Sequence, residues 1–366
     1  MIRIVGVGDI MPGGLLSGNG RPCIDDAILG VLLDGDIRCG TLECALGNEP
    51  TYDEEKVKDR GNVIYAKDTD IARLKELHMD VVSLANNHFF DLGIKGARHT
   101  IELLDAKGIM HCGAGDNLME AGKPAVMAIH GKKVAFLGFC DTEYTHVYWC
   151  TYATENTPGV NPMKKDYVIN EIKKNAALYD YVVVLAHWGT EHTFFPNIST
   201  VKMAKWMLDA GACLVLGSHP HRIQPVMNTR KGSVVYSMGN FLFPERLIAP
   251  PKVTWYPDSP IDYSSLPVTE DYPLVDCVTL KTLPFWARVG LVVVTDIEES
   301  STVSNGVVSY LDATNHITRL ADEKSRMVNS RVSHVGFWMK IGLYHPYYMI
   351  RKVFRAVLAR FKRVLR

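Results

Sequence analysis

The chain has 366 residues, of which 47% are hydrophobic and 22% are charged, so it can build the core of one large globular domain or two ordinary ones. Its formal net charge is +0 at pH 7, but the segment 351–366 carries seven Lys/Arg and no acidic residue, which leaves the rest acidic. This balance argues against nucleic-acid binding, and no apolar run is long enough to span a bilayer. The first residues lack a signal-peptide pattern and the eight cysteines lack a C-x-x-C pair, so we expect a cytoplasmic protein with reduced thiols.

Strand-like and helix-like patterns alternate along the chain, which predicts an α/β fold with mixed sheets and helices outside. Turn residues around 130–132 and a loop across 296–306 predict two hairpins. The expected strands are 2–7, 38–46, 81–85, 124–129, 133–139, 181–186, 213–216, 233–238, 288–295 and 307–311, and the expected helices are 24–33, 68–78, 93–107, 164–178, 198–210 and 322–338.

Four of the expected strands end in polar groups that can bind a metal ion or move a proton. The ligand site of an open α/β sheet lies outside the carboxyl ends of its strands, so we expect these four ends to converge on one site. A single His or Asn at a strand end is more often a turn residue, and Asp9 alone could be a cap, but four such ends favour a shared site. The ends carry Asp9, then Asn87 and His88, then His187, and finally His219 and His221 in the segment Gly217-Ser218-His219-Pro220-His221.

Imidazole, carboxylate and amide groups of this kind suit divalent ions such as Mn, Fe or Zn, and we expect one or two ions. Two ions would clamp both oxygens of an in-line displacement. His88 beside such a site could protonate a leaving group as a general acid. Asp91 is also expected to cap the helix at 93–107, and Glu43 could simply face solvent. The candidate ligands are Asp9, Glu43, Asn87, His187, His219 and His221, and the candidates for orienting them are Asn86, Asp91, Glu191 and Asn240.

Several segments, in this order, resemble the CapA-type capsule synthesis proteins, also called the poly-gamma-glutamate capsule family. The resemblance covers roughly residues 1–245 and implies a metallophosphatase-like (calcineurin-like) sandwich, in which two facing mixed β-sheets are flanked by helices, with C-terminal additions. The matching segments are Gly8-Asp9-Ile10-Met11, Thr41-Leu42-Glu43, Ala85-Asn86-Asn87-His88, His187-Trp188-Gly189-Thr190-Glu191, Gly217-Ser218-His219-Pro220-His221 and Tyr236-Ser237-Met238-Gly239-Asn240-Phe241.

The resemblance also implies a role for each candidate, with two departures from the usual pattern. Met11 stands where metallophosphatases carry a His ligand, and Thr41 stands where the capsule family often has Asn. The first metal ion is therefore expected to be weak, absent, or completed by Glu191 or water. The implied roles are Asp9 and His221 on a first ion, Glu43 as the bridge, Asn87, His187 and His219 on a second ion, and His88 as the catalytic acid.

The chain beyond 245 matches the family less. Eight of the eighteen prolines lie within 244–284, so we expect 246–288 to be an irregular loop or a lid. We expect 289–321 to complete the core sheet as a β-hairpin and 322–366 to form C-terminal helices. The tail 345–366 combines an apolar helical face with basic residues, which is typical of contact with the inner face of a membrane or with a membrane synthase. A helix packed on the body, or a frayed tail, is the alternative.

Two functions fit these observations. The ligand-bearing strand ends favour a metal-dependent hydrolase of capsule or exopolymer biosynthesis, acting on a phosphoester or on an amide or ester bond of a surface polymer. Met11 and the basic tail favour a non-catalytic, membrane-associated component of a polymer synthesis or export complex. We adopt the first. The expected partner is an anionic polymer or a phosphoester substrate rather than nucleic acid, because the body is acidic.

Overall fold

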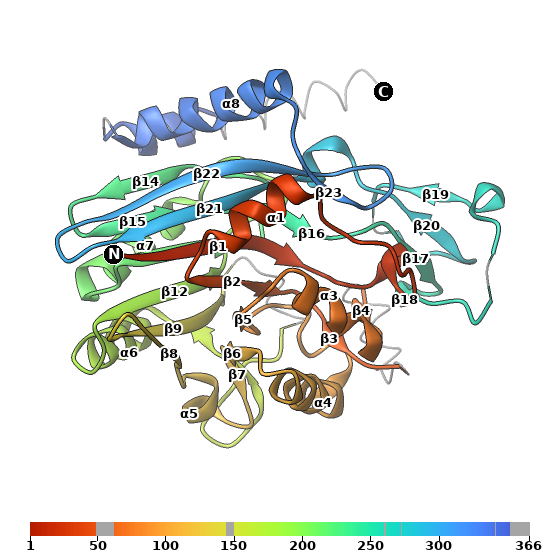
Figure 1. Ribbon diagram of the computed structural model, residues 1–366, viewed down its shortest axis with the longest axis horizontal. Helices are drawn as coiled ribbons and strands as arrows, with labels where there is room; N and C mark the ends of the chain where they lie inside the picture. Colours follow the sequence, from red (N-terminus) through yellow and green to blue (C-terminus); the bar gives the residue numbers. More distant parts are fainter. Residues whose placement is uncertain (49–61, 144–149, 260, 272, 341, 352–366) are drawn as a thin grey trace.

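Two mixed β-sheets lie face to face in the computed structural model, and helices cover both outer faces (Figure 1). The structure describes residues 1–48, 62–143, 150–259, 261–271, 273–340 and 342–351. The predicted fold class, an α/β sandwich of two facing mixed sheets flanked by helices, is confirmed.

The first sheet has eight strands and is built around the start of the chain. β1 (Ile2–Ile10) pairs in parallel with β2 and β16 and antiparallel with β21. β21 and β22 form a long antiparallel hairpin, in which β22 begins before the predicted residue 307. The order is β23-β22-β21-β1-β2-β5-β6 with β16 beside β1, and the strands are β2 (Ile37–Leu42), β5 (Val81–Ser83), β6 (Met110–Cys112), β16 (Asn240–Leu242), β21 (Val289–Ile297), β22 (Thr302–Leu311) and β23 (Ile317–Arg319).

The second sheet has seven strands, and its centre is parallel. β9, β12, β13 and β15 run in the same direction, with antiparallel β8 and β14 at the sides. β14 is not among the predicted strands, because it is short and half-exposed and carries no apolar run. The order is β11-β9-β12-β13-β15-β14 with β8 beside β9, and the strands are β8 (Ala125–Ile129), β9 (Lys132–Asp141), β11 (Pro162–Met163), β12 (Tyr181–His187), β13 (Leu214–Ser218), β14 (Val226–Thr229) and β15 (Gly232–Val235).

Alternating side chains on the strands build the apolar layers. In β12, Val183 and Leu185 join the layer between the two sheets, whereas Val182 and Val184 pack beneath the outer helices. This is the period-two pattern of a strand that is buried on both faces. Because the strand interiors are apolar, polar side chains become concentrated where the strands end.

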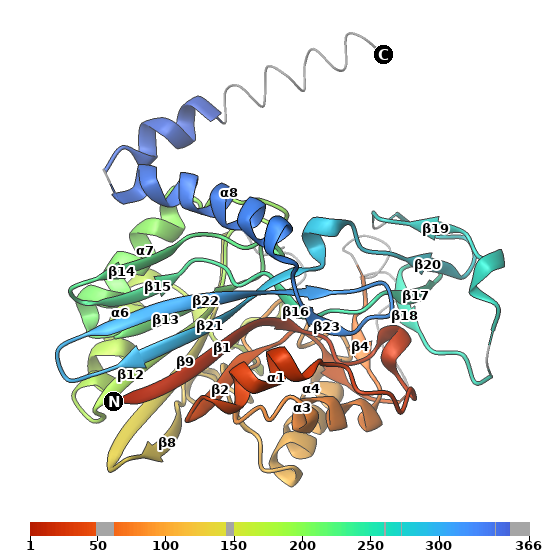
Figure 2. The same cartoon turned by 45° about the horizontal axis from the view of Figure 1, so that its top comes forward.

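The helices form the two outer layers. α1, α3 and α4 cover the first sheet, and α6 and α7 cover the second. α8 lies along one side of the sandwich, where Val328 joins the layer between the sheets (Figure 2). The α-helices are α1 (Asp26–Leu33), α3 (Ala72–Glu76), α4 (Gly93–Ala106), α5 (Leu118–Ala121), α6 (Lys165–Ala176), α7 (Ile198–Ala210) and α8 (Asp322–Lys340), and the 3₁₀ helices are η1 (Gly14–Leu16), η2 (Asp68–Ile71), η3 (Tyr263–Ser265) and η4 (Phe285–Ala287).

The helix expected over 68–78 is confirmed over residues 68–76, where η2 leads directly into the five-residue α3. The prediction for Asp91 is wrong. Asp91 does not cap α4, whose N-cap residue is Leu92. The Asp91 carboxylate instead accepts a hydrogen bond from the Ile64 amide at 2.7 Å and lies 2.7 Å from Nδ1 of His88. A nearby imidazole and a main-chain amide from another loop thus take the place of the helix amides.

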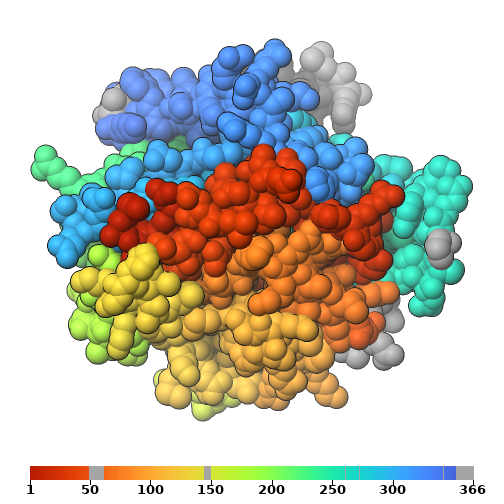
Figure 3. Space-filling model, viewed as in Figure 1, coloured from red at the N-terminus to blue at the C-terminus, as the bar shows by residue number. Residues whose placement is uncertain are grey.

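The proline-rich segment 246–288 is more regular than predicted. It contains a four-stranded sheet that forms a lobe at one end of the sandwich (Figures 1 and 3). Its prolines among the described residues lie outside the strands, because proline cannot donate a ladder hydrogen bond. The high proline content therefore led to the prediction of an irregular loop where the chain forms short strands. Their order is β18-β17-β20-β19, and they are β17 (Arg246–Ala249), β18 (Val253–Trp255), β19 (Val268–Thr269) and β20 (Thr279–Lys281). Two-stranded sheets pair β3 (Ala45–Leu46) with β4 (Tyr65–Ala66) and β7 (Ala114–Gly115) with β10 (Gly159–Val160).

The C-terminal tail can be compared with its prediction only in part. Residues 344–351 are helical, and 352–366, which carry most of the predicted basic face, lie outside the described residues. Within the described part of the chain, no helix is both long enough and apolar enough to cross a bilayer. The eight cysteines, all among the described residues, form no disulfide.

Candidate metal centre

The polar strand ends meet at one place in the sandwich. Asp9 is the second-last residue of β1, and Glu43 directly follows β2 in the first sheet. His187 ends β12 in the second sheet, and His219 and His221 follow β13. Their donor atoms form two groups, each within 4.8 Å: Glu43 with His187 and His219, and Asp9 with Glu43 and His221.

Glu43 stands between the two groups. Its Oε1 lies 3.6 Å from Nε2 of His187 and 3.6 Å from Nε2 of His221. On the other side, Nδ1 of His221 lies 3.4 Å from Oδ2 of Asp9. Metal bonds of about 2.0–2.2 Å place neighbouring donor atoms roughly 3–3.5 Å apart, so the two 3.6 Å spacings around Oε1 of Glu43 are close to those expected for ligands of shared ions. Glu43 is therefore the residue that the two candidate groups share.

Burial and hydrogen bonding also fit a divalent cation. Both carboxylate oxygens of Glu43 and Oδ1 of Asp9 are buried and have no hydrogen-bond partner among the described residues. Burial raises the pKa of Asp9 to about 7 and the pKa of Glu43 well above its usual value, and it lowers the pKa of His221 to about 3. Neutral imidazoles beside carboxylates that need a positive charge form the donor set of a transition-metal site. Either protons or metal ions must offset these carboxylates.

Three further side chains orient the second group. Oδ1 of Asn87 lies 2.8 Å from Nε2 of His187, so Asn87 faces the same space as Glu43. Oγ of Ser218 lies 2.9 Å from Nδ1 of His187 and 3.0 Å from Oγ1 of Thr41. Ser218 therefore fixes the His187 ring with Nε2 toward Glu43. Ser218 was not among the candidate residues, although it lies inside the Gly217–His221 segment.

His88 lies beside the ligand groups and is held by Asp91. Nδ1 of His88 is 2.7 Å from Oδ2 of Asp91. Asn86 fixes this turn, since its Oδ1 accepts the His88 amide at 3.0 Å and its Nδ2 donates to the Leu42 carbonyl at 2.8 Å. Burial raises the pKa of Asp91. Because Asp91 engages Nδ1, Nε2 is the nitrogen of His88 that can exchange a proton with a substrate.

Asn240 positions His221 in the first group. Its Oδ1 lies 2.7 Å from Nδ1 of His221, and its Nδ2 donates to the Ala287 carbonyl at 2.8 Å. Nε2 of His221 is thereby directed toward Glu43.

Met11 and Glu191, the two residues that bear on how the first ion would be completed, lie outside both ligand groups. Met11 is fully buried in the apolar core under the helices of the first sheet. Glu191 lies 3.8 Å from Nε2 of His192, and its charge adds to the burial that raises the pKa of both Asp9 and Glu43. The first group consists of three candidate ligands, Asp9, Glu43 and His221, and the Met11 side chain lies in the apolar core instead.

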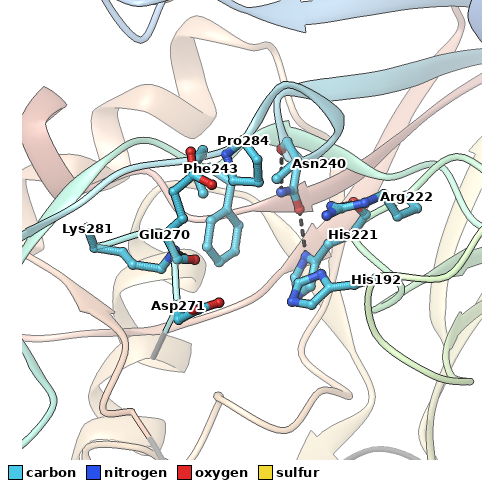
Figure 4. Close-up of a pocket in the computed structure, with 11 residues that line it drawn as sticks. His192, His221, Arg222, Asn240, Phe243, Glu270, Asp271, Lys281 and Pro284 are labelled. Carbon is cyan, nitrogen blue, oxygen red and sulfur yellow. Dashed lines mark hydrogen bonds between the residues drawn. The ribbon is translucent and has the colours of Figure 1, made fainter. Parts of the chain in front are cut away.

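A cavity of about 180 Å³ opens beside the first group (Figure 4). His221 and Asn240 line it from the core, and Lys281 and Pro284 line it from the proline-rich segment. His192 also lines the cavity, with its ring centre 5.9 Å from that of His221. The only sequence signal that points to His192 is its nearness to His187. The cavity therefore lies directly beside the candidate metal centre.

The part of this chain that is similar to known proteins includes all of the candidate metal ligands. The family model described as "Bacterial capsule synthesis protein PGA_cap" matches residues 3–245. The chain is 31% identical over 245 residues to the "Capsule biosynthesis protein CapA" of Bacillus anthracis and 32% identical over 246 residues to the "PGA biosynthesis protein CapA" of Bacillus subtilis (strain 168). Each alignment covers 65% of this chain, and they cover 58% and 62% of those two relatives.

A third relative comes from Mycobacterium rather than from Bacillus. The "Probable polyglutamine synthesis accessory protein Rv0574c" of Mycobacterium tuberculosis (strain ATCC 25618 / H37Rv) is 27% identical over 206 residues, which is 54% of each chain. The chain thus spans between about half and three fifths of the length of these relatives. Because the family model matches well over half of the chain and covers every candidate metal ligand, this protein belongs to the bacterial capsule synthesis protein family.

Proposed function

We propose that this chain is a metal-dependent hydrolase of capsule or exopolymer biosynthesis. The observation that carries this proposal is the fully buried Glu43, whose carboxylate faces both ligand groups and has no hydrogen-bond partner among the described residues. The printed names of the relatives support a role in capsule or poly-glutamate synthesis. The proposed substrate is a phosphoester, or an amide or ester bond of a surface polymer.

The chain's own residues would divide the chemistry between them. Asp9, Glu43 and His221 would hold one divalent ion, and Glu43, His187, His219 and Asn87 would hold a second. When bound, such ions polarise the scissile bond and activate water for attack at neutral pH.

Proton transfer would fall to the pair of His88 and Asp91. Asp91 holds Nδ1 of His88, so Nε2 is the ring nitrogen that would give a proton to the leaving group. Asn86 keeps the turn that carries His88 in place. Positioned general acids of this kind contribute about 10²–10⁴-fold to a rate.

A second function, a non-catalytic component that binds anionic polymer, is favoured by Met11. The resemblance expects a metal-ligating histidine at this sequence position, but the Met11 thioether is buried in the apolar core. The first group is then left with three candidate protein ligands. In this alternative the site binds anionic polymer and catalyses no reaction.

Hydrolysis assays on the metal-loaded full chain test the proposal. We expect cleavage of generic phosphoesters or of poly-γ-glutamate that is lost in His187→Ala and falls at least about 100-fold in His88→Ala. The two variants differ in a second measurement: His187→Ala should also lose bound metal, whereas His88→Ala should retain it.

Surface substitutions provide the matched control. Glu171→Gln on α6 changes a carboxylate that pairs with Lys174 and should leave turnover unchanged. Normal turnover in both histidine variants would end the hydrolase proposal. Tight polymer binding without any turnover or metal requirement would establish the second function instead.

A further inference from the structure

Two cysteine thiols touch each other beside the turn that carries His88. Cys140 is the second-last residue of β9 and is fully buried, and Cys150 is partly buried. Their Sγ atoms lie 3.7 Å apart, which is van der Waals contact, and an S–S bond would bring them to about 2.0 Å. These two residues are called the thiol pair below.

The main chain on both sides of the thiol pair is held by hydrogen bonds. The Cys140 amide donates to a carbonyl of the segment 160–161, and the Thr151 carbonyl accepts from an amide of the same segment, both at 2.8 Å. The Tyr152 hydroxyl also donates to the Asp141 carbonyl at 2.6 Å. The contact between the two thiols therefore follows from how the main chain is held, and not only from the rotamers of the two side chains.

The thiol pair also touches the turn that carries the candidate general acid. Sγ of Cys150 lies 3.9 Å from the carbonyl oxygen of Asn86, within reach of a weak hydrogen bond from the thiol. The Asn86 side chain in turn accepts the His88 amide at 3.0 Å. On the other side, Cys140 is the register partner of His187, a candidate metal ligand. A covalent bond within the thiol pair would therefore act next to both the proton donor and a strand that carries a ligand.

The two thiols differ in their access to solvent. Cys150 is partly exposed, so an oxidant in solution reaches it first, whereas Cys140 is fully buried beside it. Solvent access and a neighbouring second thiol are two features of redox-sensitive cysteines. Cys150 is thus placed to react with the oxidant, and Cys140 is placed to resolve the product.

We infer that Cys140 and Cys150 form a reversible disulfide that lowers the activity of the metal centre under oxidising conditions. Hydrogen peroxide oxidises the Cys150 thiol to a sulfenic acid and releases one water. The Cys140 thiol then attacks this sulfur, the S–S bond forms, and the sulfenic oxygen leaves as a second water. The peroxide gains the two electrons that the thiols lose. A dithiol reductant reverses the step by thiol–disulfide exchange and becomes a disulfide itself.

The inference rests on the proposed function, because the activity that oxidation lowers is the proposed hydrolysis. The S–S bond removes the thiol hydrogen that Cys150 offers to the Asn86 carbonyl, and it moves Sγ relative to the turn that carries His88. Because a displacement of about 1 Å can cost about 10²-fold in rate, turnover should fall about tenfold or more. Neither ligand group contains a cysteine, so the bound metal should stay in place.

Peroxide titration of the zinc-loaded full chain tests this inference, since Zn²⁺ itself has no redox chemistry. Mass spectrometry of non-reduced peptides should show a link between Cys140 and Cys150 after treatment with a small excess of hydrogen peroxide. Turnover should fall about tenfold or more while the zinc content is unchanged, and dithiothreitol should remove the link and restore turnover.

Cys150→Ser and Cys277→Ser form a matched pair of variants. Cys277 is exposed and lies outside the thiol pair, so Cys277→Ser should respond to peroxide as the wild type does. Cys150→Ser should keep its turnover before treatment and lose the response. An equal loss of turnover in both variants would assign the oxidation to another site and would overturn the inference.

Wild-type protein supplies a check that does not depend on how a variant folds. Both cysteines remaining as thiols after peroxide treatment, or a complete link between them with unchanged turnover, would contradict a redox switch at the thiol pair. The two proposals fail separately. Reduced protein without any hydrolysis ends the proposed function although the link can still be measured, whereas hydrolysis without a link leaves the proposed function standing and ends only this inference.

Discussion

The two walls of the cavity differ in how the chain builds them. The core wall places His221 and Asn240 at the ends of strands that the apolar interior of the sandwich holds in position. The outer wall places Lys281 through the pairing of β17 and β20, two short strands separated by a long stretch of chain. The core wall carries groups suited to holding metal ions, and the outer wall carries none of the candidate ligands. Changes in the core should therefore affect the reaction, and changes in the lobe should leave the bound metal in place.

The largest effect is expected for Glu43→Gln, because this carboxylate serves both ligand groups. Turnover should fall at least about 1,000-fold, since the metal chemistry contributes several kcal/mol to the barrier. The metal-free variant should also unfold at a higher denaturant concentration than the metal-free wild type, because a buried carboxylate without a partner has been removed. Activity assays and denaturant titrations measure the two effects. A variant that is both active and no more stable would show that Glu43 is not a metal bridge.

A smaller loss is expected for His88→Asn, which removes a proton donor and leaves the ligand groups intact. Turnover should fall about 10²–10³-fold on substrates with poor leaving groups and much less on substrates with good ones. Comparing alkyl and nitrophenyl leaving groups in the same assay tests this. Equal losses on both would mean that His88 does not protonate the leaving group.

Metal removal should lower the stability of the wild-type chain. At a free metal concentration 100 times the dissociation constant, binding stabilises the native state by about 2.7 kcal/mol, which corresponds to a rise in melting temperature of about 3 °C for a chain of this size. Thermal melts with added Mn²⁺ or Zn²⁺ and with a chelator measure the difference. Glu43→Gln should show little response. A full response in that variant would locate the metal elsewhere.

The smallest effect is expected for Lys281→Met in the lobe, because Lys281 belongs to neither ligand group. This variant should retain the metal content of the wild type, and its melting temperature should respond to added Mn²⁺ or Zn²⁺ as that of the wild type does. Elemental analysis and thermal melts measure the two properties. A loss of metal comparable with that of Glu43→Gln would show that the two walls do not act separately.

The two walls also differ in how well the sequence predicts them. Asp9, His187 and His221 can be selected from the sequence because each follows an apolar strand, a pattern that a few neighbouring residues reveal. Their convergence follows from the general position of sites at strand ends. The outer wall has no local signal, because Arg246 and Lys281 become neighbours only through strand pairing. The prolines between the strands suggested a loop, so the sheet that aligns these two cations was missed.

Smaller errors have the same physical origin. Asp91 has the sequence position of a helix cap, but a histidine three residues earlier and an amide from another loop compete for its carboxylate. Ser218 has no local sequence signal, because its partner, His187, lies on the neighbouring strand rather than nearby in the chain. Contacts made across strands decide these roles, and local patterns carry no information about them.

Elemental analysis of the purified full chain tests the central claim most directly. If the strand ends form a metal centre, wild-type protein should retain one or two transition-metal ions per chain after exhaustive dialysis, and Glu43→Gln should retain far less. Wild-type protein without bound metal, even after incubation with Mn²⁺, Fe²⁺ or Zn²⁺, or a Glu43→Gln variant with the same metal content, would contradict the account.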